Sequence, residues 1–115
     1  MKEVCSVTNN LLVIRLDSDL DHHIAQRIRE EIDRKIMETS IRSLAFDFRK
    51  VNFMDSSGIG LIMGRYKKIH PTGGVVYACN LNSQMQRIFR IFGLQEITEQ
   101  NEEIDKLINE EVTYE

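Results

Sequence analysis

The most informative stretch of this sequence is Val51-Asn52-Phe53-Met54-Asp55-Ser56-Ser57-Gly58-Ile59-Gly60. It has the pattern of a strand end, a turn of acidic and hydroxyl residues, and a glycine-rich helix start. Asp55, Ser56 and Ser57 are all good N-cap residues, because the oxygen of such a side chain accepts a hydrogen bond from a free amide of the first helical turn. Capping is therefore the simplest interpretation of these three residues.

Strands and helices alternate on both sides of this stretch. The helix that follows it is predicted to end before Pro71 and Gly73, which stand in typical stop positions. The pair Asn9-Asn10 predicts a hairpin turn, since asparagine tolerates positive φ. The predicted strands are 3–8, 11–16, 43–48, 75–78 and a short edge strand at 95–98, and the predicted helices are 22–38, 57–69, 83–92 and 102–111.

This alternation predicts an α/β fold, because parallel strands need long crossover connections that are usually helical. The initial hairpin makes the sheet mixed. The strand at 75–78 is wholly apolar, which predicts a place at the centre of the sheet. We therefore expect a single domain over residues 1–115, with its core at about 3–111, in which a mixed β-sheet is flanked by about four helices.

The spacing of apolar residues indicates which helix faces are buried. The helix at 22–38 carries an apolar stripe at three- and four-residue steps, made of Ile24, Ala25, Ile28, Ile32 and Ile36. The helix at 83–92 ends on Ile91 and Phe92, which we expect to pack in or beside the core. Gly93 follows directly, and glycine at this position predicts a helix C-cap in the left-handed conformation.

Composition excludes several classes of function. The net charge of -3, with acids interleaved among the bases, argues against a nucleic-acid partner. The first residues lack the apolar region of a signal peptide, and no apolar run reaches the length of a membrane span, so we expect a cytoplasmic protein with no membrane association. Cys5 and Cys79 lie outside any CxxC motif or Cys/His cluster, so no metal and no cofactor is expected.

Three chemical interpretations compete for the Asp55-Ser56-Ser57-Gly58 turn. Gly58, Gly60 and Gly64 have the spacing G-x-G-x-x-x-G, one residue longer than the dinucleotide fingerprint, and close packing of the helix on the sheet explains them better. A serine hydrolase would need a glycine two residues before its nucleophile, where Met54 stands, and no spacing argument places a histidine beside Ser56 as its base. The third interpretation is a regulatory phosphosite, since a serine at a helix N-terminus is accessible and its free amides tolerate a phosphate.

Several motifs of the chain resemble the STAS-domain anti-sigma factor antagonists, most closely the sporulation branch of that family. They are Asp21-His22-His23, Phe53-Met54-Asp55-Ser56-Ser57-Gly58-Ile59-Gly60, Gly64-Arg65-Tyr66-Lys67, Gly73-Gly74 and Phe92-Gly93-Leu94. The likeness runs in register from about residue 11 to residue 99. Ser18 stands where the family often has glycine, so the loop at 17–21 is expected to differ in detail.

The resemblance implies a binding protein rather than an enzyme. Its unphosphorylated form would bind an anti-sigma factor that is also an ATP-using serine kinase, and would thereby release a sporulation sigma factor. The kinase would phosphorylate the first serine of the D-S-S-G run, Ser56, and a PP2C-type phosphatase would remove the phosphate. A STAS regulator of a general stress pathway is the alternative within the fold; a serine hydrolase and a small-ligand or nucleotide-binding protein are the alternatives from other classes.

The expected partner-binding residues lie at the starts of two helices. Loops at one end of an α/β sheet cluster together, so the start of the first helix is expected near Ser56. His22 and His23 face different ways on a helix and make a poor metal pair, so they are expected to be exposed or to contact a partner. The expected binding residues are Asp19, Asp21, His22, Asp55, Ser56, Ser57 and Gly58.

Overall fold

The computed structural model describes the backbone of residues 5–113 and the side chains of residues 5–110. The strands are β1 (Cys5–Thr8), β2 (Leu11–Arg15), β3 (Ser43–Asp47) and β4 (Val76–Cys79). The helices are α1 (His22–Glu38), α2 (Ser56–Ile69), α3 (Ser83–Ile91) and α4 (Glu102–Thr113), with the short 3-10 turns η1 (His70–Thr72) and η2 (Leu94–Glu96). The predicted α/β fold is confirmed.

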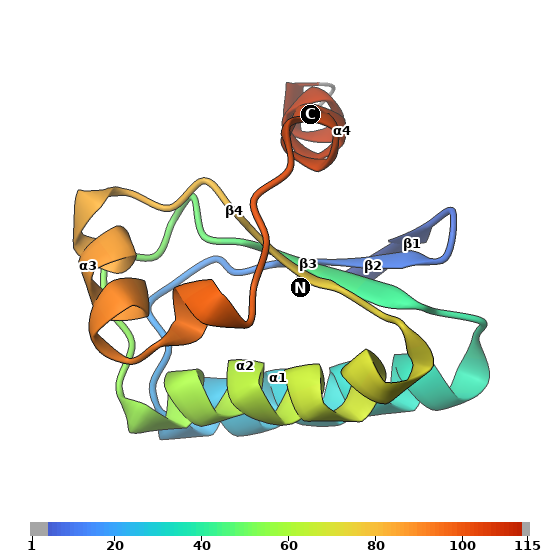
Figure 1. Ribbon diagram of the computed structural model, residues 1–115, viewed down its shortest axis with the longest axis horizontal. Helices are drawn as coiled ribbons and strands as arrows, with labels where there is room; N and C mark the ends of the chain where they lie inside the picture. Colours follow the sequence, from blue (N-terminus) through green and yellow to red (C-terminus); the bar gives the residue numbers. More distant parts are fainter. Residues whose placement is uncertain (1–4, 114–115) are drawn as a thin grey trace.

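The four strands form one mixed sheet in the order β1-β2-β3-β4. β1 pairs antiparallel with β2, whereas β2–β3 and β3–β4 are parallel. The hairpin turn is at Asn9 and Asn10, whose φ angles of 49° and 67° confirm the expected left-handed conformation. Because the parallel pairs are joined through α1 and α2, both helices lie on the same face of the sheet (Figure 1).

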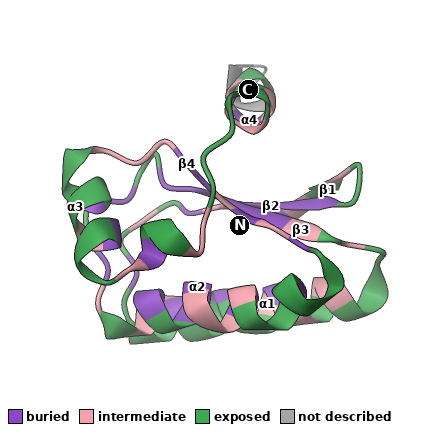
Figure 2. Cartoon of the chain, in the orientation of Figure 1, coloured by how far each residue is buried: buried purple, intermediate pink, exposed green. Residues whose placement is uncertain are grey.

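Helices cover both faces of the sheet. Alternate residues of a strand point to opposite faces, so Leu12 and Ile14 of β2 belong to the large core that α1, α2 and α3 close, while Leu11 and Val13 point the other way. There they meet Ile108 of α4 in a smaller core. Figure 2 shows β2, β3 and β4 mostly buried, β1 partly exposed, and the outer sides of the helices exposed.

Two expectations about the sheet are wrong. β4 is an edge strand rather than the centre of the sheet. Residues 95–98 are not a strand, since η2 occupies 94–96, and only Glu99 bridges to Tyr77 of β4. The amides of Ala78 and Glu99 donate to the carbonyls of Glu99 and Val76, both at 2.9 Å, and so satisfy part of the edge. The apolar sequence of β4 therefore reflects burial of its two faces, which helices on both sides of the sheet produce.

The end of α3 also differs from expectation. Ile91 and Phe92 are 64% and 50% exposed, so neither packs in the core. The buried side chains of α3 are Met85 and Phe89, one turn apart, and Ile91 lies two residues beyond Phe89, which places it on another side of the helix. At Gly93 the chain turns with a φ of 72°, confirming the predicted left-handed cap.

Candidate functional site

α2 begins one residue earlier than predicted, at Ser56, with Asp55 as its N-cap. The carboxylate of Asp55 accepts a hydrogen bond from the amide of Ser57 at 2.8 Å, and its carbonyl accepts one from Gly58 at 3.0 Å. Ser56 is the first helical residue and its side chain is exposed. A hydroxyl at this position faces solvent beside the free amides and the positive end of the helix dipole, where a phosphate is favoured.

The loop before α1 is tied to the chain that leads into α2. One carboxylate oxygen of Asp19 accepts from the amides of Asn52 and Phe53, at 2.8 and 3.2 Å. Leu20 bridges to Met54, and its carbonyl accepts from the amide of Asp55 at 3.2 Å. Asp19 therefore has a structural role, because it holds the two segments together.

The starts of α1 and α2 lie side by side. Asp21 caps α1 by accepting from the amide of Ile24 at 2.9 Å. The Nδ1 atom of His22 lies 3.3 Å from the Oγ atom of Ser57. The predicted clustering of these loops is confirmed in its geometry, whereas the binding roles of the residues stay a prediction.

The histidines are exposed, as expected, and their rings meet edge to face with centroids 5.7 Å apart. In the part of the chain that the structure describes, no group of three His, Cys, Asp or Glu side chains is placed to hold a metal ion. The hydrolase interpretation named Ser56, but His22 contacts Ser57 instead. No carboxylate among the described residues hydrogen-bonds to the His22 ring, so this pair lacks the orienting third group of a catalytic triad.

Gly58 has a different function from the other glycines of α2. A Cβ atom at Gly58 would lie 2.8 Å from the Cβ of Met54 and 3.1 Å from that of Leu20, so the close approach predicted for it is confirmed. The same atom at Gly60 or Gly64 would meet nothing within 4 Å. Close packing on the sheet is therefore wrong as the explanation for Gly60 and Gly64, because their open sides face α1 rather than the strands.

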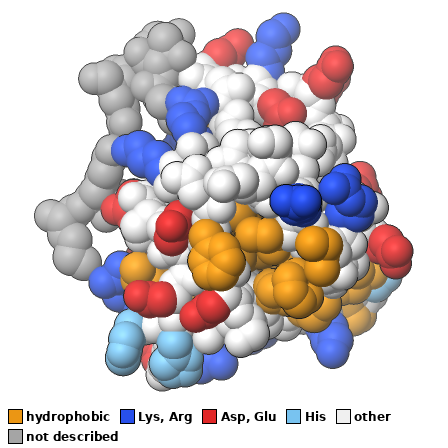
Figure 3. All heavy atoms as spheres, turned by 90° about the vertical axis from the view of Figure 1, so that its left-hand side faces the viewer, with side chains coloured by type: hydrophobic (Ala, Val, Ile, Leu, Met, Phe, Trp, Pro, Cys, Tyr) orange, Lys and Arg blue, Asp and Glu red, His pale blue; other side chains and the backbone are white. Residues whose placement is uncertain are grey.

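Sequence reasoning missed an apolar surface beside this site. Phe53, which precedes the cap, is 58% exposed, and it belongs with the exposed Ile91 and Phe92 to the end of the molecule that carries α3 and the starts of α1 and α2. Figure 3 shows apolar side chains gathered on this face, with acidic groups and the two histidines toward one border. We call Phe53, Ile91 and Phe92 the apolar patch. Ile91 does not fit the Met85–Phe89 spacing, which was the available signal for its exposure. Phe92 does fit that spacing, but it follows the last residue of α3 as the C-cap, so its exposure had no such signal.

Comparison with known proteins agrees with this architecture. A family model described as the STAS domain matches residues 4–110. The anti-sigma F factor antagonist of Paenibacillus polymyxa is 36% identical over 87 residues, which are 76% of this chain and 74% of that protein. That of Lysinibacillus sphaericus is 34% identical over 88 residues, covering 76% and 75%. This chain belongs to the STAS-domain anti-sigma factor antagonists.

Solved structures of this family exist in two phosphorylation states. The Bacillus cell fate determinant SpoIIAA in its phosphorylated form is 31% identical, with a TM-score of 0.70 over 90% of this chain and 94% of that one. Unphosphorylated SpoIIAA is 34% identical, with a TM-score of 0.65 over 75% and 78%. Among residues 5–113 of this STAS domain, no helix combines the length and apolarity needed to cross a membrane.

Proposed function

We propose that this protein is an anti-anti-sigma factor whose switch is Ser56. Its unphosphorylated form binds an anti-sigma factor that is also a nucleotide-bound serine kinase, and thereby releases a sporulation sigma factor. Phosphorylation of Ser56 ends this binding. The observation that carries the proposal is the exposed hydroxyl of Ser56 directly after the N-cap Asp55, in a chain similar to proteins solved with and without phosphate.

The binding face consists of Asp19, Asp21, His22, Asp55, Ser56, Ser57 and Gly58 together with the apolar patch. Gly58 is buried, so it contributes by holding the start of α2 close to Leu20 and Met54. The apolar patch supplies area to desolvate, and the surrounding acids select a partner with cationic groups. This combination is typical of a protein-binding surface rather than of a catalytic pocket.

The phosphate acts by changing the charge of this face. It adds about -1.5 to -2 charges at pH 7 beside Asp55. A partner whose cationic groups already pair with the acids of this face would have to desolvate the added charge without a further matching cation, which costs several kcal/mol. A micromolar complex is worth about 8 kcal/mol, so such a penalty is large enough to dissociate it.

In the cell, a PP2C-type phosphatase removes the phosphate from Ser56 and restores the binding form. The protein acts in the cytoplasm, without enzymatic activity, cofactor, membrane association or direct contact with nucleic acid. The second candidate is a STAS regulator of a general stress pathway. It is favoured by a relative from Staphylococcus aureus that is described as an anti-sigma-B factor antagonist and is 25% identical to this chain.

The test is reconstitution with purified partners. The protein is titrated with an anti-sigma F kinase and, separately, with an anti-sigma-B kinase, each with ADP, before and after phosphorylation. We expect the unmodified protein to bind the sporulation kinase and the phosphorylated form to lose at least tenfold in affinity. Equal affinity of both forms would reject the switch at Ser56, and preference for the stress kinase would favour the second candidate. Turnover of ester substrates by the protein alone would instead indicate a hydrolase.

A further inference from the structure

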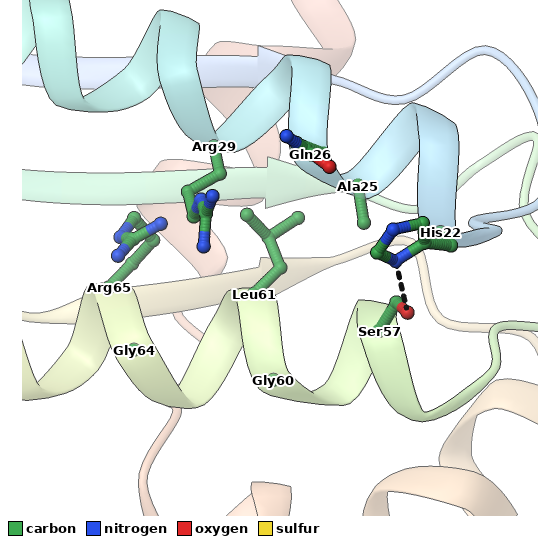
Figure 4. Close-up of a pocket in the computed structure, with 9 residues that line it drawn as sticks. All are labelled: His22, Ala25, Gln26, Arg29, Ser57, Gly60, Leu61, Gly64 and Arg65. Atoms are coloured by element: carbon green, nitrogen blue, oxygen red, sulfur yellow. Dashed lines mark hydrogen bonds between the residues drawn. The ribbon is translucent and has the colours of Figure 1, made fainter.

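A groove of about 360 Å³ lies between α1 and α2, and it borders the binding face described above, with which it shares His22 and Ser57. His22 and Ser57 stand at one end of the groove, and Arg29 and Arg65 at the other (Figure 4). The two helices run side by side in the same direction. Gly64 is seven positions after Ser57, so the groove is about 10 Å long at the helical rise of about 1.5 Å per residue.

The groove exists because two residues of α2 have no side chain. A Cβ atom at Gly60 or Gly64 would meet no heavy atom within 4 Å, so the space beside both glycines is empty of protein. An alanine would fit at either position without a clash. The fold therefore does not require glycine at these positions, in contrast to Gly58.

Positive charge accumulates at the far end of the groove. Arg65 pairs with the Oδ1 atom of Asp33 at 3.3 Å, and Lys68 pairs with the same oxygen at 3.4 Å. Arg29 makes no ion pair among the described residues, and its guanidinium and that of Arg65 point toward one another in Figure 4. The carboxylate of Asp33 thus pairs with two cations, and Arg29 adds a third positive charge at this end of the groove, in a chain whose net charge is -3.

Arg65 also lacks hydrogen-bond partners. Its relative exposure is 9%, and its Nη1 atom is buried with no hydrogen-bond partner in the described structure. Buried polar groups are nearly always satisfied, so an exception indicates a missing partner. Burial lowers the pKa of Arg65, the carboxylate of Asp33 raises it, and the positive charge of Arg29 lowers it again.

We propose that this groove binds a small phosphate-bearing anion, with the phosphate between Arg29 and Arg65. Planar guanidinium groups suit phosphate because they donate two parallel hydrogen bonds, and an anion between the two arginines removes their repulsion. The rest of the ligand lies over Gly60 and Gly64 and points toward His22 and Ser57. The site is independent of the phosphorylation of Ser56, which lies outside the groove.

The experiment is an NMR titration of the folded protein with inorganic phosphate, at constant ionic strength maintained with chloride. We expect saturable shifts of the amides of Gly60, Gly64 and Arg65. Arg29→Gln should weaken binding at least tenfold, because it removes one of the two guanidinium groups. Arg27→Gln is the matched control, since Arg27 is an exposed arginine of the same helix that does not line the groove.

A second variant and two further probes separate the possible outcomes. Gly64→Leu should abolish binding by filling the groove while the protein stays folded, as its circular dichroism will show. Glycerol 3-phosphate should bind at least as tightly as inorganic phosphate, and succinate more weakly. The proposal would be overturned if the shifts did not saturate, or if Arg27→Gln and Arg29→Gln weakened binding equally. It would also be overturned if Gly64→Leu bound phosphate unchanged, or if succinate bound more tightly than phosphate. Unchanged phosphate binding by Ser56→Ala is expected, and its loss would contradict the independence of the two sites.

Discussion

The Nδ1 atom of His22 lies 3.3 Å from the Oγ atom of Ser57, and this contact joins the first turn of α1 to the first turn of α2. It distinguishes two adjacent serines. Ser57 is half-buried and faces α1, whereas Ser56 is exposed and its side chain makes no hydrogen bond within residues 5–110. Only the hydroxyl of Ser56 is therefore fully available to an incoming kinase.

Ser56, and not Ser57, should be phosphorylated by the cognate kinase. Mass spectrometry of the tryptic phosphopeptide will locate the group. Ser56→Ala should resist phosphorylation and still bind the anti-sigma factor, while Ser57→Ala, the matched control, should still be modified. A phosphate found on Ser57 would show that the exposed hydroxyl is not the substrate.

Phosphorylation should leave the stability of the domain nearly unchanged. The helix dipole favours an exposed phosphate by about 0.3–1 kcal/mol, and repulsion from Asp55 opposes it by a similar amount. About 1 kcal/mol corresponds to a change of about 4 °C in Tm for a domain of this size, so we expect a shift of no more than a few degrees by calorimetry. A much larger shift would mean that the switch works by unfolding rather than at the binding face.

Gly58→Ala should destabilise the protein, because the new Cβ atom would lie 2.8 Å from that of Met54. Overpacking of this kind costs about 1–3 kcal/mol, to be measured by urea denaturation. Gly60→Ala and Gly64→Ala are matched controls in the same helix. Their added Cβ atoms meet nothing within 4 Å, so we expect them to stabilise the protein by about 0.5–1 kcal/mol. Equal effects at all three glycines would contradict the close approach at Gly58.

Charged substitutions in the apolar patch should weaken partner binding without unfolding the protein. Ile91→Glu and Phe53→Glu place a carboxylate on an exposed apolar surface, so stability should change by about 0.5 kcal/mol or less. Binding of the unphosphorylated form to the kinase should weaken at least tenfold, measured by calorimetric titration. Met37→Glu is the control, since Met37 is 83% exposed near the end of α1 and lies outside the patch. If Ile91→Glu and Met37→Glu bind alike, the patch is not part of the interface.

Both cysteines should be unreactive in the folded protein. Cys5 and Cys79 are 1% exposed. Burial raises the pKa of the Cys79 thiol well above its ordinary value, and the nearby carboxyl group of Asp105 raises it further. Because a raised pKa keeps the thiol protonated, Cys79 should not react with a disulfide reagent at pH 8 until the chain is unfolded in guanidinium. Rapid reaction of Cys79 in buffer would indicate that α4 leaves the sheet readily, whereas rapid reaction of Cys5 would indicate that the large core on the other face opens.

Local signals in the sequence determined most of the elements and the centre of the candidate site. The stripe at three- and four-residue steps predicted α1 at its observed bounds, because helical periodicity is set within one segment. The Asn9-Asn10 turn was likewise predictable, and the cap of α2 was narrowed to Asp55, Ser56 or Ser57, since a turn and a cap depend on residues a few positions apart. Ser56 as an exposed residue at a helix start follows from the same short-range chemistry.

The tertiary structure alone decided which distant residues meet. Three features depend on how the strands and helices are arranged in space. They are the edge position of β4, the exposure of Ile91 and Phe92, and the facing guanidinium groups of Arg29 and Arg65. Composition and spacing report how apolar a segment is, but not which neighbour covers it. The apolar sequence of β4 is the same whether its two faces are covered at the centre of a sheet or at its edge. Strand pairing distinguishes the two positions, because β4 pairs with β3 on one side and, within residues 5–113, has only the bridge to Glu99 on the other.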